Sequence, residues 1–239
     1  MLSLNQKSKV VVLTGAGISA ESGIGTFRDR NGLWENHRIE DVATPQGFSR
    51  DPSLVWSFYR QRWLQSQSVS PNPAHYALVA LEQYLGKNFL LITQNVDNLH
   101  TRAGSTQLIE MHGSLNRCYC IACKAQYLMQ DLDINQGLPR CPKCNALLRP
   151  DIVWFGEIPY YLYEIENALK ACDYFIIIGT SGVVYPAAGF VMTAKLMGAK
   201  TLAINLEKPD NLGFIDEFHQ AKSGELLPAL VAEWTQKAV

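Results

Sequence analysis

The sequence carries little excess charge, no long apolar run and no leader pattern. Its 21 lysine and arginine residues nearly balance 22 aspartate and glutamate residues, giving a formal net charge of −1. Such a balance provides no overall attraction for nucleic acid or for an anionic membrane, so we expect neither as a partner. No apolar stretch approaches the roughly 20 residues of a membrane-spanning helix.

The first residues resemble neither a signal peptide nor a transit peptide. The chain has six cysteines, and without an export signal these favour free thiols in a reducing compartment. We therefore expect a cytoplasmic protein, and we expect it to be a monomer.

The composition is that of a folded protein with a large core. Hydrophobic residues make up 47% of the 239 residues and charged residues 18%, which excludes a disordered chain. The length fits one large domain, or one large domain with a smaller insert. Internal repeats and low-complexity segments are absent from the sequence.

Four apolar runs predict buried strands, at residues 9–13, 89–93, 174–178 and 200–205. Each run ends in a polar or glycine-rich turn, a pattern typical of a parallel sheet covered on both faces. The segment 51–85 is predicted to be helical, with prolines near two helix starts, at Pro52 and Pro73.

These patterns predict an α/β fold with a Rossmann-like parallel sheet. Two regions interrupt the alternation of strands and helices, and we expect them to form a smaller lobe with a helical module and a metal-binding module. The expected large domain comprises residues 1–30, 89–116 and 149–239, and the smaller lobe comprises residues 31–88 and 117–148.

Two Cys-x-x-Cys pairs are separated by seventeen residues. Each pair forms a tight knuckle, so together they can supply four thiolates to a tetrahedral zinc ion, from Cys120, Cys123, Cys141 and Cys144. Four protein ligands leave no open position, which indicates a structural metal. The alternative, a disulfide framework, is disfavoured because no export signal is present. We expect Cys118 and Cys172 to lie outside the site.

The turn after the first predicted strand fits the G-x-G-x-x-A form of a dinucleotide-binding fingerprint, over residues 15–20. Glycines there let the backbone approach a pyrophosphate, and a helix N-terminus offers N–H groups to it. The following residues contain too many glycines for a long regular helix. We expect a mobile loop that carries Phe27 and Arg28 over a cofactor.

Several short motifs occur in order along nearly the whole chain, at residues 15–19, 25–28, 93–97, 112–113, the two cysteine pairs, 153–157 and 179–181. Each motif alone is weak, but the ordered set is specific. Together they resemble the sirtuin family of NAD-dependent protein deacylases. In that family, NAD is a consumed co-substrate: the acyl oxygen of a modified lysine attacks C1′ of the nicotinamide ribose as nicotinamide leaves.

The resemblance implies roles for particular residues. His112 matches the family's base, and an imidazole can accept a proton near neutral pH; outside this context, a lone histidine would be interpreted as a core residue. Asn95 is expected to hold the ribose and a nearby water. The resemblance places the cofactor against Gly15, Ala16, Gly17, Ser19, Ala20, Glu21, Thr26, Phe27, Arg28, Trp34, Gln94, Asn95, Asp97, Gly179, Thr180, Ser181, Asn205, Leu206, Glu207 and Ser223.

The resemblance also implies that an acylated protein segment binds as an added strand, which reads little side-chain sequence. Simple hydrophobic packing is the alternative role for the aromatic side chains in this region. One edge for the added strand would be Val153, Trp154, Phe155, Gly156 and Glu157, and the opposite edge would include Val183 and Tyr185.

Tyr59 and Arg62 are spaced as neighbours on one helix face. Within the sirtuins this Tyr-x-x-Arg motif resembles a subgroup that removes succinyl, malonyl and glutaryl groups. An arginine suits an acyl carboxylate because its planar fork can bind both oxygens. Ala43 matches the same subgroup, where a small residue leaves room for a longer acyl chain. The alternative is a pair on the surface of an amphipathic helix.

Other functions stay open at this point. A dinucleotide oxidoreductase would share the first turn, but it has no need of a zinc site. A zinc-containing module could bind acylated proteins without turnover, although the presence of Asn95, Asp97 and His112 argues against this. A protein ADP-ribosyltransferase or a general deacetylase on the same scaffold is the remaining alternative.

Overall fold

The computed structural model describes residues 4–25, 33–34, 37–134 and 137–236. Its central sheet has six parallel strands in the order β11-β10-β9-β1-β4-β5. The strands are β1 (Val10–Thr14), β4 (Phe89–Thr93), β5 (Leu108–Glu110), β9 (Tyr174–Ile178), β10 (Lys200–Asn205) and β11 (Glu217–Gln220). The predicted parallel sheet is thus confirmed.

Three of the four predicted strands, β4, β9 and β10, have the predicted bounds, and β1 begins one residue later than expected. The two edge strands, β5 and β11, were not predicted. They are short and only partly buried, so they lack the continuous apolar run that marks the inner strands.

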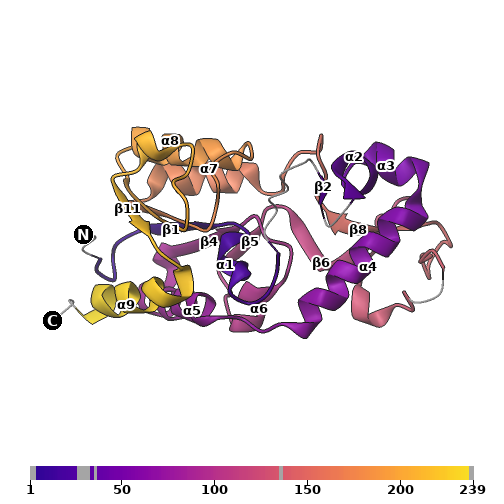
Figure 1. Ribbon diagram of the computed structural model, residues 1–239, viewed down its shortest axis with the longest axis horizontal. Coiled ribbons are helices and arrows are strands. Elements are labelled where there is room, and N and C mark those ends of the chain that lie inside the picture. Colours follow the sequence, from indigo (N-terminus) through magenta and orange to yellow (C-terminus); the bar gives the residue numbers. More distant parts are fainter. Residues whose placement is uncertain (1–3, 26–32, 35–36, 135–136, 237–239) are drawn as a thin grey trace.

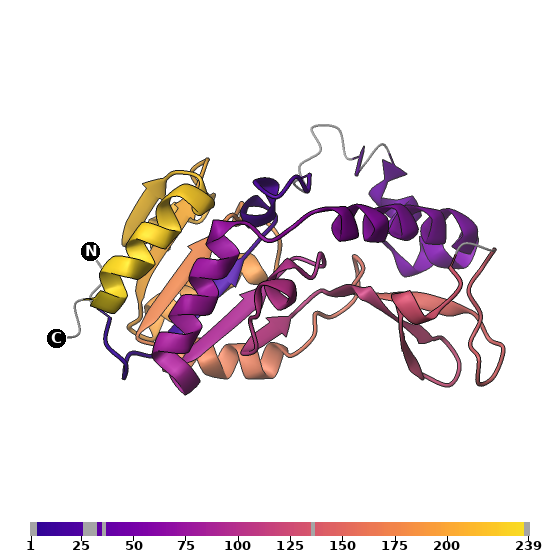
Figure 2. The same cartoon turned by 90° about the horizontal axis from the view of Figure 1, so that it is seen from below.

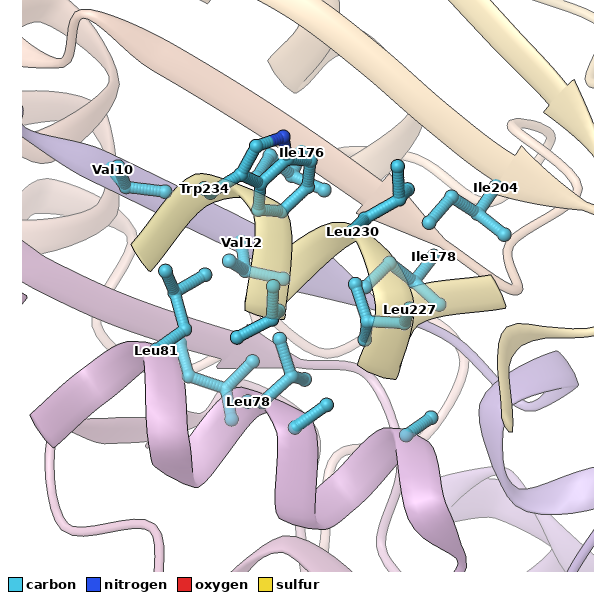
Figure 3. Close-up of a cluster of buried hydrophobic side chains, with 14 of the residues drawn as sticks. Val10, Val12, Leu78, Leu81, Ile176, Ile178, Ile204, Leu227, Leu230 and Trp234 are labelled. Atoms are coloured by element: carbon cyan, nitrogen blue, oxygen red, sulfur yellow. The ribbon is translucent and has the colours of Figure 1, made fainter. Parts of the chain in front are cut away.

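Helices cover both faces of this sheet (Figure 1). On one face lie α5 (Pro73–Leu85) and α9 (Ser223–Gln236), and on the other lie α7 (Leu162–Ala171) and α8 (Phe190–Leu196). Alternate side chains of β1 serve the two layers. Val10 and Val12 pack with α5 and α9, as Figure 3 shows, whereas Val11 and Leu13 pack with α7 and α8. Burial on both faces explains why the strand is apolar throughout.

A smaller part of the molecule extends away from the large sheet (Figure 2). Its three-stranded antiparallel sheet has the order β7-β6-β8. Its elements are β6 (Gly113–Cys120), β7 (Gln126–Leu128) and β8 (Leu148–Ile152), with α2 (Ile39–Val42), α3 (Pro45–Arg50), α4 (Pro52–Ser68) and the two-residue strands β2 (Leu33–Trp34) and β3 (His37–Arg38).

The long helix α4 packs on this small sheet through a shared apolar core. Within that core, the indole Nε1 of Trp56 donates to the carbonyl of Leu148, 2.9 Å away. Strands β6 and β8 run through both predicted domain boundaries, 116/117 and 148/149. These strands therefore connect the large sheet to the zinc-binding module, and the two-domain division stays a prediction.

The predicted helix starts at Pro52 and Pro73 are confirmed. Each proline occupies the first turn, where its missing N–H costs nothing. The preceding side chains, Asp51 and Asn72, cap the helices by accepting from backbone N–H groups of Leu54 and Ala74. No helix in the described part of the chain has both the length and the apolar character needed to cross a membrane.

The four predicted metal ligands come together at the far end of the small sheet. The Sγ atoms of Cys120, Cys123, Cys141 and Cys144 all lie within 4.8 Å of one another. The Cys120–Cys144 and Cys123–Cys141 pairs are 3.4 and 3.7 Å apart. A tetrahedral zinc with bonds of about 2.3 Å requires sulfur separations of about 3.8 Å. The cluster therefore fits one structural zinc.

Cys118 and Cys172 lie outside this cluster, as predicted. The Cys118 thiol is buried and faces the carbonyl of Tyr127 at 3.8 Å. Cys172 is buried against α7 and β9, where burial raises the pKa of its thiol to about 11.

We predict that Cys141→Ser releases the zinc and destabilises the smaller part of the molecule, because metal binding and local folding are coupled. Cys118→Ser is the matched control, since it alters a nearby buried thiol outside the cluster. Zinc content per chain and the thermal unfolding midpoint measure both effects. Stoichiometric zinc in Cys141→Ser, or its loss from Cys118→Ser, would contradict the ligand set.

Candidate active site

A single pocket of about 700 Å³ joins the large sheet to the smaller part of the molecule. Its lining includes the loops that follow β1, β4, β9 and β10, together with parts of α4 and the loop after β8. Strand β1 lies between β4 and β9 in the sheet. After β1, the chain adds β4 and β5 on one side, and it later adds β9, β10 and β11 on the other side. Ligands of open α/β sheets bind at this kind of switch point, beyond the carboxyl ends of the strands.

The pocket gathers nearly all the predicted site residues. Among the described residues, the predicted catalytic, cofactor and substrate residues all line the pocket, with the exception of Val183. Val183 is 55% exposed. Thr26, Phe27 and Arg28 lie outside the described residues, as does the side chain of Trp34. The predictions for those four positions, including the mobile loop, stay predictions.

Several lining residues were not predicted. Most are sequence neighbours of predicted ones and are apolar, so a motif search gives no signal for them. The set comprises Ile24, Gly25, Val96, Ile152, Pro159, Ile204, Ala221 and Lys222. Val184, which belongs to the predicted peptide edge with Val183 and Tyr185, also lines the pocket. Ala221 and Lys222 follow the edge strand β11, which was not predicted, so no strand end marked their position in the sequence.

The first glycines of the pocket allow two loops to touch. The N–H of Gly15 donates to Ile178, and the N–H of Gly17 donates to Gly179 at 2.8 Å. A Cβ on Gly17 would lie 2.6 Å from the Cα of Gly179, and one on Gly15 would lie 2.8 Å from the Gly179 carbonyl oxygen. Both glycines are therefore needed for the packing of the loops after β1 and β9. The following helix α1 (Gly17–Ala20) is short, as expected.

His112 is oriented by a backbone carbonyl. Its Nδ1 lies 3.1 Å from the carbonyl oxygen of Gln94. A carbonyl can only accept, so Nδ1 carries the proton of the neutral ring and Nε2 is left as the basic nitrogen. Burial of the imidazole lowers its pKa, and the bond to Gln94 offsets part of that shift. The ring is therefore neutral, and able to accept a proton, at neutral pH.

The residues after β4 are fixed by short polar contacts. The Asn95 side-chain amide donates to the carbonyl of Gly15 and to the hydroxyl of Ser19, at 3.1 Å each. The backbone N–H of Asn95 donates to the Thr93 hydroxyl at 3.0 Å. These bonds attach the Asn95 loop to the glycine loop after β1.

Asp97 is buried in the same wall of the pocket. Burial raises the pKa of its carboxyl, while hydrogen bonds from the N–H of Leu99 and the hydroxyl of Ser19 oppose the rise.

A further hydrogen bond joins the loop after β4 to the loop after β9, where the Gln94 amide donates to the Thr180 hydroxyl at 3.1 Å. The loops after β1, β4 and β9 thus form one hydrogen-bonded unit.

At the other end of this wall, Glu21 joins the first loop to the last helix. Its Oε1 accepts from the Ser223 hydroxyl at 3.1 Å and from the N–H of Gly224 at 2.8 Å. A carboxylate at a helix N-terminus is favourable because unpaired N–H groups and the helix dipole meet it there. The Asn205 amide similarly donates to the Thr180 carbonyl at 3.0 Å.

Most backbone N–H groups of the segment 153–157 already donate to other groups of the protein. The N–H of Val153 donates to His112 and that of Phe155 donates to Ala43, each at 3.0 Å. The N–H of Trp154 donates to the Glu157 carboxylate at 2.9 Å, and Glu157 donates to the Trp154 carbonyl. An added strand must therefore rely on carbonyl groups and on the N–H of Gly156.

The side chain of Glu157 holds this segment in place. Its carboxylate forms a two-pronged ion pair with the buried Arg149, with oxygens 2.7 and 2.6 Å from the guanidinium nitrogens. Burial alone would raise the pKa of Glu157, but the bonds from Arg149 and from the N–H of Trp154 outweigh it and the pKa is lowered. The carboxylate thus has a supporting role; sequence patterns gave no indication of Arg149.

Tyr59 and Arg62 lie inside the molecule. Their exposed fractions are 1% and 9%, and both line the pocket together with Ala43. The alternative of a pair on a helix surface is therefore wrong. The Trp154 indole donates to the Tyr59 hydroxyl at 2.9 Å, and the Arg62 guanidinium lies 5.9 Å from the centre of the Phe58 ring.

Known proteins resemble this chain over almost its whole length. A sequence profile of the Sir2 family matches residues 15–186. An NAD-dependent protein deacylase of Pasteurella multocida is 52% identical over 235 residues, covering 97% of this chain and 100% of the relative. Another from Bdellovibrio bacteriovorus is 50% identical over 238 residues, covering 98% and 100%.

Solved structures share the fold. A Sir2 homologue in complex with NAD is 40% identical, with a TM-score of 0.88, and the match covers 97% of this chain and 91% of that one. A Sir2–p53 peptide–NAD⁺ complex is 32% identical, with a TM-score of 0.83 and coverage of 94% and 92%. By profile, sequence identity and fold, the chain belongs to the Sir2 family, the sirtuins.

Proposed function

We propose that this protein removes acyl groups from the lysine side chains of other proteins and consumes NAD as a co-substrate. The products are nicotinamide, the free lysine and O-acyl-ADP-ribose. We further propose a preference for acidic acyl groups, namely succinyl, malonyl and glutaryl, with weaker activity on acetyl. The substrate is an acylated lysine in an extended protein segment.

One observation carries this proposal: a single pocket is lined by His112, by the loops at the switch point of the sheet, and by the buried pair Tyr59 and Arg62. His112 suits the role of proton acceptor, and the loops at the switch point suit a dinucleotide. The buried pair suits a carboxylate on the acyl group. The relatives named NAD-dependent protein deacylase and the neighbours solved with NAD and with a peptide support the same reaction.

NAD, when bound, supplies a ribose carbon whose bond to nicotinamide breaks as the acyl oxygen attacks it. The loops after β1 and β9 would hold the phosphates, because their backbone approaches the pocket without side chains in the way. Asn205 and Glu207 would face the adenosine ribose, and Asn95 and Asp97 the nicotinamide ribose. All four line the pocket.

His112 would accept a proton from a ribose hydroxyl at Nε2. The Gln94 carbonyl keeps the proton on Nδ1 and so leaves Nε2 basic. Because the lowered pKa keeps the ring neutral, the base is ready at neutral pH.

Arg62 would bind the distal carboxylate of the acyl chain, with the Tyr59 hydroxyl as a further donor. Ala43 is buried in the same wall, and its small side chain leaves room for a chain longer than acetyl. We also propose that the protein acts as a monomer in the cytoplasm, where its free cysteines stay reduced.

One lysine peptide carrying different acyl groups tests the proposal, with NAD present and products followed by mass spectrometry. We expect nicotinamide release with every acyl group that is removed, and a higher kcat/KM for succinyl than for acetyl. Equal or higher acetyl turnover would reduce the function to general deacetylation. A lasting mass increase on the peptide would instead indicate ADP-ribose transfer.

For the base, we predict that His112→Ala lowers kcat by about 10²- to 10⁴-fold while the fold persists, because general-base contributions have this size. His219→Ala is the control, since His219 pairs with Glu217 on the edge strand β11, outside the pocket lining. Turnover and the thermal unfolding midpoint are measured for both. Near-normal turnover of folded His112→Ala would show that another group is the base.

The pH profile gives a separate prediction. Burial depresses the pKa of His112, so the neutral form dominates at and above the ordinary histidine pKa of about 6.5. We expect kcat/KM to be level above that pH and to fall at lower pH, as the imidazole gains its second proton. Measurement of kcat/KM from about pH 5 to pH 9 tests this. An acid limb centred above about pH 7 would contradict the assignment.

For acyl choice, we predict that Arg62→Met lowers kcat/KM for succinyl-lysine by about tenfold to hundredfold, since a charge-assisted hydrogen bond contributes about 1.5–3 kcal/mol. Acetyl-lysine has no carboxylate, so the succinyl-to-acetyl ratio should fall. Arg60→Met is the matched control, because Arg60 lies on the same helix and reaches the carbonyl of Gly137 instead. Equal losses on both substrates would mean that Arg62 supports the fold or the NAD site.

A further inference from the structure

The indole of Trp154 contacts one of the two residues assigned to the acidic acyl group. Its Nε1 lies 2.9 Å from the hydroxyl oxygen of Tyr59, and both side chains are buried, with exposed fractions of 2% and 1%. An indole N–H can only donate, so the Tyr59 oxygen is the acceptor of this bond. The hydrogen of the Tyr59 hydroxyl must therefore point in another direction.

The position of the indole is itself fixed. The Arg149 guanidinium carbon lies 3.6 Å from the centre of a Trp154 ring, and the two-pronged bond to Glu157 holds the guanidinium plane. The backbone N–H of Trp154 donates to the same carboxylate. On another side, the Phe48 ring packs against the indole with centroids 5.3 Å apart. A shift of the indole would disturb a buried ion pair, so Tyr59 receives its hydrogen bond from a rigid donor.

This bond also affects what Tyr59 can offer a ligand. A hydroxyl that accepts one hydrogen bond becomes a stronger donor, because the two bonds polarise each other in a low-dielectric site. Burial raises the pKa of Tyr59 well above its ordinary value. The group is therefore a neutral phenol with a proton to donate at neutral pH.

We infer that Trp154 is a positioning residue that sets acyl preference: its indole N–H holds the Tyr59 hydroxyl so that the hydroxyl donates to the distal carboxylate of an acidic acyl group. The inference rests on the proposed function. An acetyl group carries no acceptor at that distance along the chain, so the same bond contributes little to its selection. Trp154 thus acts on the substrate through Tyr59.

Replacement of the indole tests this role. Trp154→Phe keeps an aromatic ring for Arg149 to stack on and removes the N–H. We expect the succinyl-to-acetyl ratio of kcat/KM to fall by about threefold to tenfold, the range that one hydrogen bond accounts for. Trp56→Phe is the matched control: Trp56 lies in the same core, and its indole N–H donates to the Leu148 carbonyl. Its ratio should equal that of the wild type.

A double-mutant cycle separates this role from a structural one. If Trp154 acts through Tyr59, Trp154→Phe should no longer change the ratio in a Tyr59→Phe background. Should Trp154→Phe fold poorly, benzothienylalanine at position 154 keeps the bicyclic shape and replaces the N–H with sulfur. The same fall in the ratio is then expected.

Failure of this inference and failure of the proposed function give different results. If wild type prefers succinyl and Arg62→Met removes that preference, but Trp154→Phe or the sulfur analogue leaves the ratio intact, this inference is wrong and the proposed function stands. If the ratio falls equally with and without the Tyr59 hydroxyl, Trp154 acts by packing and the inference is also wrong. If wild type shows no succinyl preference, the acyl preference in the proposed function fails first.

Discussion

The contact between the loops after β1 and β9 is the constraint on which the pocket depends. With glycine at positions 17 and 179, the two backbones approach closely enough to hydrogen-bond, and a Cβ on Gly17 would lie only 2.6 Å from the neighbouring Cα. These strands flank the point where the chain reverses its direction of sheet growth. At that point the wall of the pocket is made of backbone, and no side chain of Gly17 or Gly179 projects into the pocket. A ligand can therefore approach the backbone of both loops closely.

The smaller sheet serves the same pocket from its far end. His112 immediately precedes β6, and Val153 immediately follows β8. Cys120 ends β6 and pairs with Leu148 at the start of β8, close to the zinc-binding cluster. A metal at one end would therefore fix the register of two strands whose other ends lead to the proposed base and to the proposed peptide-binding segment. The ion can be structural and still affect the geometry of the reaction site.

The sequence predicted those helices and strands whose local residue pattern matches their place in the fold. Inner strands have continuous apolar runs, so their positions were predicted to within one residue. Prolines in the first turns of α4 and α5 marked the two helix starts, but the break between the helices after Ser68 was not predicted. The edge strands β5 and β11 have no such signal because one side lacks a neighbour. In the site, the ordered motifs located the residues of the loops, whereas Arg149 was missed: its role depends on Glu157 and on a tryptophan ring 3.6 Å away, and neither contact leaves a pattern in the sequence.

The Glu21–Gly224 bond has a consequence for how the chain acquires its pocket. It joins residues 203 positions apart, and the central strand β1 gains its β9 neighbour only when the chain has reached residue 178. At a synthesis rate of about 5–20 residues per second, the glycine loop waits about 10–40 seconds on the ribosome for these partners. Until residues 174–178 have been synthesised, the edge of β1 that pairs with β9 is unpaired. Of the two neighbours of β1, β4 is synthesised first. Pairing with β4 would protect the other edge of β1 in the nascent chain.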